Sequence, residues 1–166
     1  MFRSFAVRAT VALAALLTPS LLAAQSVPSL FTPIQPCRLF DSRFPAGSLP
    51  LVAGTTYQIA VRKTASQLEE GACGVPEAAN AIFVTPIATG AVDRGYVRLW
   101  ASDLLTPVSS TFNFRGNGQD SSGTFVRLCA PPLNECSAVD MSIRVELNDS
   151  HVILDLVGYT TPVSTE

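Results

Sequence analysis

The single histidine is the first residue to test for chemistry, since a Ser-His-Asp hydrolytic centre would have to use His151. Asp155 follows in an alternating stretch, so both side chains share one strand face, about 13–14 Å apart and beyond hydrogen-bond reach. No G-x-S-x-G turn is present to raise a serine nucleophile. We expect His151 to start a strand and to pack or hydrogen-bond locally, and we predict no catalytic residue.

The acidic residues offer a second kind of chemistry, because a pair of carboxylates can hydrolyse glycosides even when they are distant in sequence. Most of the 13 acidic residues lie in predicted turns or on polar strand faces. Asp155 instead lies between two leucines, and a buried carboxylate needs a partner. We predict that Arg38, Asp41, Arg43 and Asp155 form a structural ion-pair cluster joining the first and last segments. A charged catalytic pocket is the alternative.

A third group of residues could bind a ligand by stacking. Tyr96, Arg98 and Trp100 alternate with Val97 and Leu99, so the three share one strand face. If that face is exposed, two aromatic rings and a guanidinium form a flat strip suited to a sugar or a partner protein. The alternative is that a second layer or a loop covers Trp100.

The four cysteines, Cys37, Cys73, Cys129 and Cys136, predict two disulfides. Residues 130–135 have the composition of a turn that favours Cys129 with Cys136, and Cys37 with Cys73 then follows. Three pairings are formally open, and the sequence alone does not choose among them. A metal site is not supported, because the chain has no C-x-x-C pair and one histidine.

The amino terminus has the pattern of an export signal. Residues 1–24 combine two arginines, a short apolar run and small residues before Gln25, which predicts a cleaved signal peptide. An uncleaved membrane anchor is the alternative, although the apolar run is shorter than the roughly 20 residues that span a bilayer. We therefore expect a secreted protein (extracellular, at the cell surface or periplasmic) that does not insert into a membrane after cleavage.

Composition narrows the class further. Eleven basic and 13 acidic residues give a net charge of −2, which becomes more negative when the leader is removed. This balance excludes an electrostatic nucleic-acid binder, which needs a basic face. Twelve prolines and ten glycines argue against long helices and for many turns.

Period-2 alternation indicates strands along almost the whole mature chain. We expect an extended lead-in over 25–36, a short helix-like stretch over 65–71, and a hairpin turn at Asn148-Asp149-Ser150. The pattern predicts one all-β antiparallel sandwich of about seven to nine strands over 31–160, with a lead-in at 25–30 and a tail at 161–166. The expected strands are 55–62, 80–87, 95–101, 110–115, 124–128, 139–147 and 151–159.

Five motifs in order resemble a widespread module of secreted bacterial proteins. The opening P-C-R-L-F-D-S-R lies at 36–43, C-G-V-P at 73–76, G-Y-V-R-L-W at 95–100, S-S-T-F-N-F at 109–114 and H-V-I-L-D-L-V-G-Y at 151–159. The resemblance covers 31–160 and implies a β-sandwich without a known catalytic activity. Two departures are Pro86, expected to interrupt the pairing of its strand, and the insert between Cys129 and Cys136.

Together these features predict an exported, non-catalytic binding module without cofactor or metal, whose partner is a glycan or a surface protein. A structural or fibre-forming subunit is the alternative, since the proline-rich lead-in could pair with a neighbour's sheet edge. A secreted hydrolase is the least favoured interpretation.

Overall fold

The computed structural model describes residues 28–62, 73–130, 136 and 139–163, and in these residues the chain forms nine strands and no α-helix. The helix-like stretch expected at 65–71 lies outside the described residues. None of the described residues forms a helix of the length and apolarity that crossing a membrane requires. The strands are β1 (Ser29–Asp41), β2 (Thr56–Ile59), β3 (Ala81–Thr89), β4 (Gly95–Ala101), β5 (Phe112–Phe114), β6 (Gln119–Ser121), β7 (Thr124–Arg127), β8 (Met141–Glu146) and β9 (His151–Pro162).

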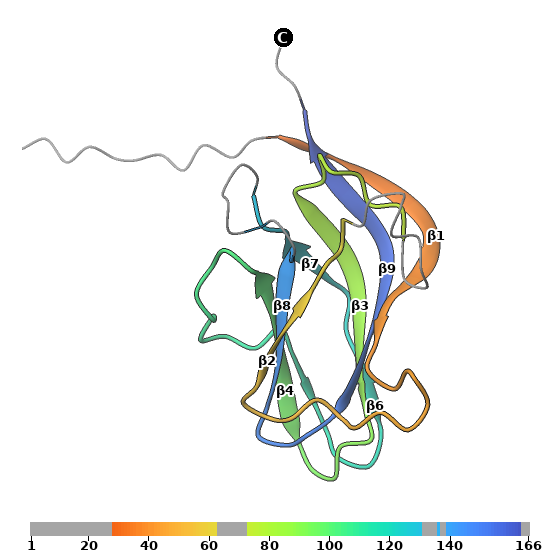
Figure 1. Ribbon diagram of the computed structural model, residues 1–166, viewed down its shortest axis with the longest axis vertical. Helices are drawn as coiled ribbons and strands as arrows, with labels where there is room; N and C mark the ends of the chain where they lie inside the picture. Colours follow the sequence, from red (N-terminus) through yellow and green to blue (C-terminus); the bar gives the residue numbers. More distant parts are fainter. Residues whose placement is uncertain (1–27, 63–72, 131–135, 137–138, 164–166) are drawn as a thin grey trace, which may run out of the picture.

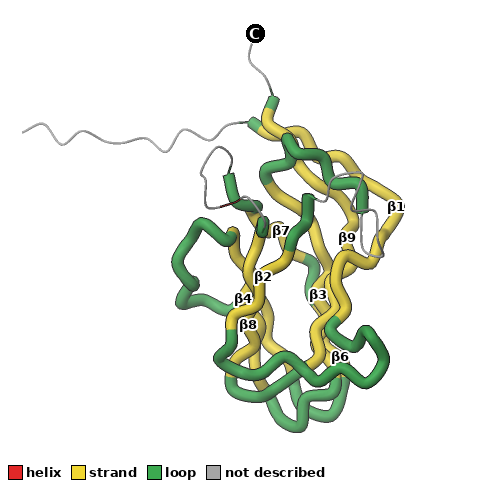
Figure 2. The backbone as a smooth tube through the Cα atoms, in the orientation of Figure 1, coloured by secondary structure: helices red, strands yellow, loops and turns green. Residues whose placement is uncertain are grey.

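The strands form two antiparallel sheets that pack face to face (Figure 1). One sheet has the order β1-β9-β3-β6, with β7 also paired to β3, and the other has the order β2-β8-β4-β5. Figure 2 shows the strands running along the long axis, with many of the connecting loops gathered at the lower end. The prediction of a disulfide-stapled all-β sandwich is confirmed.

The core lies between the sheets and follows the alternation of the strands. Met141, Ile143 and Val145 of β8 are fully buried, whereas Arg144 and Glu146 point to the outer face. On the facing sheet Val152, Leu154 and Leu156 of β9 belong to the same apolar cluster and form the other side of the core. Each such aliphatic side chain contributes about 1.5–3 kcal/mol by leaving water.

The expected hairpin between residues 139–147 and 151–159 is wrong. β8 belongs to the four-stranded sheet and β9 to the five-stranded sheet, so Asn148-Asp149-Ser150 carries the chain across the core. The two strands therefore face each other through their apolar sides instead of sharing backbone hydrogen bonds. Leu147, which begins the crossing, has a positive φ of 74° and is 67% exposed.

Pro86 interrupts pairing on only one side of β3, a narrower effect than expected. Toward β9 the ladder runs without a shift from Val84 to Thr89, with Pro86 opposite Leu154. On the other side β7 pairs with residues 81–84 and β6 with residues 87–89, and Pro86 lies in the gap between them. Its carbonyl accepts from Ser122 N at 3.3 Å on that side. Since N and C=O of one strand residue point the same way, the missing N–H faces the gap.

The lead-in is a strand of the sheet. Residues 29–36 open β1, which pairs with β9 along its length, so the sheet extends two residues beyond each predicted end of the sandwich. Gly158 allows this close pairing, because a Cβ there would overlap the Phe31 ring and lie 2.7 Å from Thr32 O. Phe31, Phe83 and Phe125 then meet edge to face, with centroids 4.9–6.4 Å apart.

A buried ion pair that the sequence did not single out links four segments. The side chains of Arg62 and Asp140 are 4% and 9% exposed, with Nε and Oδ1 3.0 Å apart. The other carboxylate oxygen accepts from the N–H groups of Val61 and Arg62, at 2.5 and 2.8 Å. Arg62 also donates to the carbonyl oxygens of Cys129 and Glu77. The pair therefore fixes the chain after β2 against the start of β8.

Candidate functional site

The predicted ion-pair cluster is present at the β1–β9 pair. Arg38 lies directly opposite Asp155 and contacts it through two nitrogens, at 2.5 and 3.2 Å. Arg38 Nη1 also donates to Asp41 at 2.8 Å, and Arg43 donates to Asp41 from its backbone and side chain at 2.7–3.0 Å. Hydrogen bonds from Arg43 lower the pKa of Asp41 to about 2. Every charge is paired within the cluster, which fits its structural role.

His151 takes part in a local hydrogen bond, as expected for a histidine that starts a strand. Its Nδ1 lies 3.2 Å from the Ser42 hydroxyl, and that hydroxyl accepts from Val152 N at 2.9 Å. Ser42 is 7% exposed, and its own backbone N–H donates to Val152 O. The pair therefore continues the β1–β9 ladder past Asp41.

The two disulfides join the cysteines that the sequence favoured. Cys37 is bonded to Cys73 and Cys129 to Cys136, with Cα atoms 5.7 and 5.8 Å apart. Among the described residues no group of three potential ligands could hold a metal ion. Two disulfides in a domain of this size are typical of an oxidising, extracellular-type compartment.

The predicted strip of Tyr96, Arg98 and Trp100 is not an exposed surface. All three side chains lie on the outer face of β4, but Trp100 is only 7% exposed and Ser142 opposite it is 3% exposed. The outer face is therefore covered toward the end of β4, and Trp100 is not available for stacking. Alternation assigns the three residues to one face, but coverage by other segments decides whether that face meets solvent.

Tyr96 remains half-buried, and its ring is held by charged neighbours. The Arg98 guanidinium lies 5.2 Å from the ring centroid and donates to the Tyr96 hydroxyl at 3.1 Å. Arg98 is in turn 3.2 Å from Glu146, which lies directly opposite Tyr96 in the ladder. Arg144 reaches the same Glu146 oxygen at 2.9 Å. Because Arg98 is itself held by Glu146, the tyrosine has little freedom to turn.

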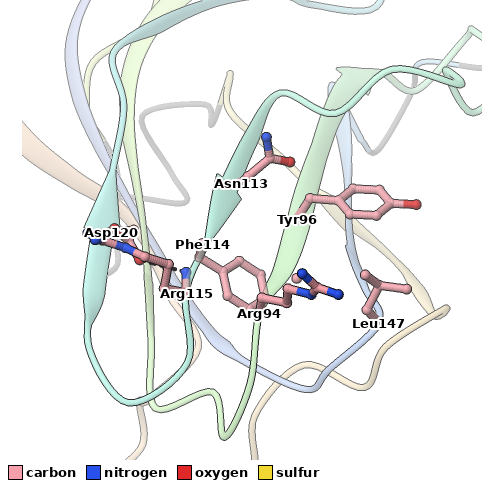
Figure 3. Close-up of a pocket in the computed structure, with 8 residues that line it drawn as sticks. Arg94, Tyr96, Asn113, Phe114, Arg115, Asp120 and Leu147 are labelled. Carbon is pink, nitrogen blue, oxygen red and sulfur yellow. Dashed lines mark hydrogen bonds and ion pairs between the residues drawn. The ribbon is translucent and has the colours of Figure 1, made fainter.

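Tyr96 also lines a pocket of about 530 Å³ beside the start of β4 (Figure 3). The pocket lies where β4 and β5 of one sheet meet β6 of the other. Its volume is within the range of about 300–1,000 Å³ typical of small-molecule sites. The lining residues are Arg94, Gly95, Tyr96, Asn113, Phe114, Arg115, Asp120 and Leu147.

Close backbone packing forms the base of this pocket. Gly95 lies opposite Phe114 in the ladder, and a Cβ at Gly95 would overlap the Phe114 ring and stand 2.5 Å from Glu146 O. Only glycine therefore lets the Phe114 ring lie this close to β4. Leu147 adds a second apolar side chain, which is largely exposed, and its backbone is in the left-handed conformation. Such a conformation is uncommon outside glycine and tends to occur at functional sites.

The polar side chains of the pocket differ in how they are engaged. Asp120 accepts from Arg115 twice, from the backbone N at 2.7 Å and from Nη2 at 3.0 Å, and these bonds lower the pKa of Asp120. Arg94 is held by its backbone, whose N donates to Asp93 at 2.7 Å and whose carbonyl accepts from Asn148 at 2.9 Å. In the part of the chain that the structure describes, the Arg94 guanidinium has no ion-pair partner.

Of the pocket residues, sequence reasoning had identified only Tyr96. Arg115 and Leu147 are the last residues of the predicted strands 110–115 and 139–147, but β5 and β8 end one residue earlier, and Leu147 is exposed and not part of the core. Arg94 lies in a connection, and Asp120 lies on the short β6, which the alternation did not predict. An apolar residue beside a turn triplet was the one local feature that could have drawn attention to Leu147. The pocket forms only when strands of both sheets meet.

No protein-family model, no curated protein and no solved structure matches this chain. The pocket and its residues are therefore the starting point for a functional assignment.

Proposed function

We propose that this protein is an exported, non-catalytic binding module that holds a glycan in the pocket beside Tyr96. The observation that carries the proposal is a preorganised tyrosine at a pocket with an apolar base and a polar rim. Rigid aromatic side chains bind well because little conformational freedom is lost on contact.

The chemistry of the pocket suits a sugar. The Tyr96 ring and the Leu147 side chain offer apolar contact to the C–H groups of a pyranose ring, above the buried Phe114 ring. The Asn113 amide, the two guanidinium groups and the Asp120 carboxylate are placed around them and can exchange hydrogen bonds with hydroxyl groups. This mixture of apolar base and few polar groups is typical of small-ligand sites.

The lining residues favour binding over hydrolysis. Glycoside hydrolysis ordinarily needs two carboxyl groups, about 5–5.5 or 6.5–9.5 Å apart. Asp120 is the one carboxylate among the eight lining residues, and it is engaged by Arg115. A general acid would also need a raised pKa, whereas the pKa of Asp120 is lowered.

Export is supported by the pattern of residues 1–24 and by the two disulfides. The five motifs that resemble a module of secreted bacterial proteins point the same way. The alternative of a fibre-forming subunit loses its main argument, because residues 29–33 of the lead-in pair with β9 of their own chain.

A glycan array followed by titration calorimetry on the purified protein tests the proposal. We expect Tyr96→Ala to weaken the best ligand about 10- to 100-fold, equivalent to about 1.4–2.8 kcal/mol. Phe125→Ala is the matched control, since Phe125 is 57% exposed on the opposite sheet and should leave binding unchanged. Equal binding by Tyr96→Ala and wild type would contradict the site. Turnover of a bound glycan would contradict the non-catalytic assignment.

A further inference from the structure

We infer that the ligand is an acidic glycan, and that Arg94 binds a carboxylate of the sugar. This inference rests on the proposed function, because it names the class of ligand that the same pocket takes.

The first step is the charge balance inside the pocket. Its lining contains two guanidinium groups, Arg94 and Arg115, and one carboxylate, Asp120. Asp120 accepts two hydrogen bonds from Arg115, so these two charges compensate each other. The charge of Arg94 is left without a counterpart among the described residues. The lining therefore carries one surplus positive charge.

The second step is the position of that charge. Hydrogen bonds of the Arg94 backbone with Asp93 and Asn148 fix the position of its main chain, while its side chain is exposed to solvent. Figure 3 shows the Arg94 guanidinium on the same side of the pocket as Tyr96 and Leu147, with Arg115 and Asp120 on the other side. A sugar in contact with the tyrosine ring would thus lie within reach of the uncompensated guanidinium.

A second positive charge lies behind the tyrosine. Arg98 and Arg144 stand directly opposite each other on β4 and β8 and share the single carboxylate of Glu146. The surroundings of Tyr96 thus carry a local positive excess, although the chain as a whole has a net charge of −2. Charges closer than the Debye length, about 10 Å at 0.1 M salt, are only partly screened, so this excess favours an anion in contact with the tyrosine.

A carboxylate fits this arrangement better than a neutral group. The planar fork of a guanidinium matches the two oxygens of a carboxylate, and such charge-assisted bonds are about twice as strong as neutral ones. A neutral sugar can accept a hydrogen bond from Arg94 through a hydroxyl group, but it does not compensate the surplus charge. The geometry therefore favours sugars of the uronic acid class.

The test compares ligands that differ only in charge. Oligogalacturonate, oligomannuronate and hyaluronan oligosaccharides are each titrated beside their carboxyl-reduced, neutral counterparts. We expect the acidic form of at least one pair to bind tenfold or more tightly than its neutral form, with the difference shrinking as salt rises. Sulfated oligosaccharides form a separate arm, and preference for sulfate over carboxylate would overturn the assignment to uronic acids.

Two substitutions of opposite sign sharpen the test. Arg94→Gln should weaken acidic ligands about tenfold and neutral ones much less, because the glutamine amide can still donate a hydrogen bond to a hydroxyl group. Arg94→Lys should restore part of the loss for acidic ligands. Asp120→Asn frees the Arg115 guanidinium and should strengthen acidic ligands severalfold. Equal binding of acidic and neutral forms would overturn the inference while leaving the proposed glycan site intact. If no saccharide of either kind binds, the proposed function itself fails.

Discussion

Asp41 should stabilise the fold more than Asp155, the other carboxylate of the ion-pair cluster, and Asp41→Asn tests this. Its side chain is 5% exposed and accepts four hydrogen bonds from Arg38 and Arg43. The pKa of Asp41 falls from 3.8 to about 2. At about 1.4 kcal/mol per pKa unit this corresponds to about 2 kcal/mol at neutral pH. Both arginines are partly exposed, so screening reduces the expected loss to about 1–2 kcal/mol.

The pH dependence gives the sign of the effect. Because the pKa is lowered in the folded state, the stabilisation from ionised Asp41 is complete above about pH 5 and is lost as the pH falls through about 2. Wild type and Asp41→Asn should therefore differ in free energy of unfolding at pH 7 and converge near pH 2.

Urea unfolding at pH 7, 4 and 2 measures this difference. Trp100 is the single tryptophan and is buried, so its fluorescence reports unfolding directly. Asp155→Asn is the matched control, since it removes a carboxylate of the same cluster that is 28% exposed, and it should cost less. A variant as stable as wild type at pH 7, or a deficit that persists unchanged at pH 2, would refute the reasoning.

Two further substitutions test buried positions. Trp100→Ala should lower the free energy of unfolding by about 3–5 kcal/mol, measured by circular dichroism, because the indole is 7% exposed. An unchanged thermal melt would show that Trp100 does not contribute to the packing of the fold. Asp140→Asn should cost about 3–5 kcal/mol in urea unfolding, since it leaves the buried Arg62 guanidinium without its charge partner. A loss below 1 kcal/mol would show that the carbonyl oxygens around Arg62 suffice to hold it.

The local pattern of the sequence determined the class of fold. Alternation is a property of a single strand, so the apolar side of residues 141–145 and the polar side carrying Arg144 could be recognised without knowing any partner. Turn residues marked where strands end, and the composition between Cys129 and Cys136 favoured the local disulfide. The Arg38–Asp155 pair followed from a simpler rule, that a carboxylate between leucines needs a cation.

Only the tertiary structure decided which strands share a sheet and which faces are covered. The alternation of β8 and β9 is the same whether they form a hairpin or cross the core, and the choice depends on pairing with β4 and β3. Burial of Trp100 depends on segments outside its own strand. The pocket beside Tyr96 arises where the two sheets meet, and the residues that line it are spread along the chain between Arg94 and Leu147. Such contacts are set by packing between distant segments, which no local period encodes.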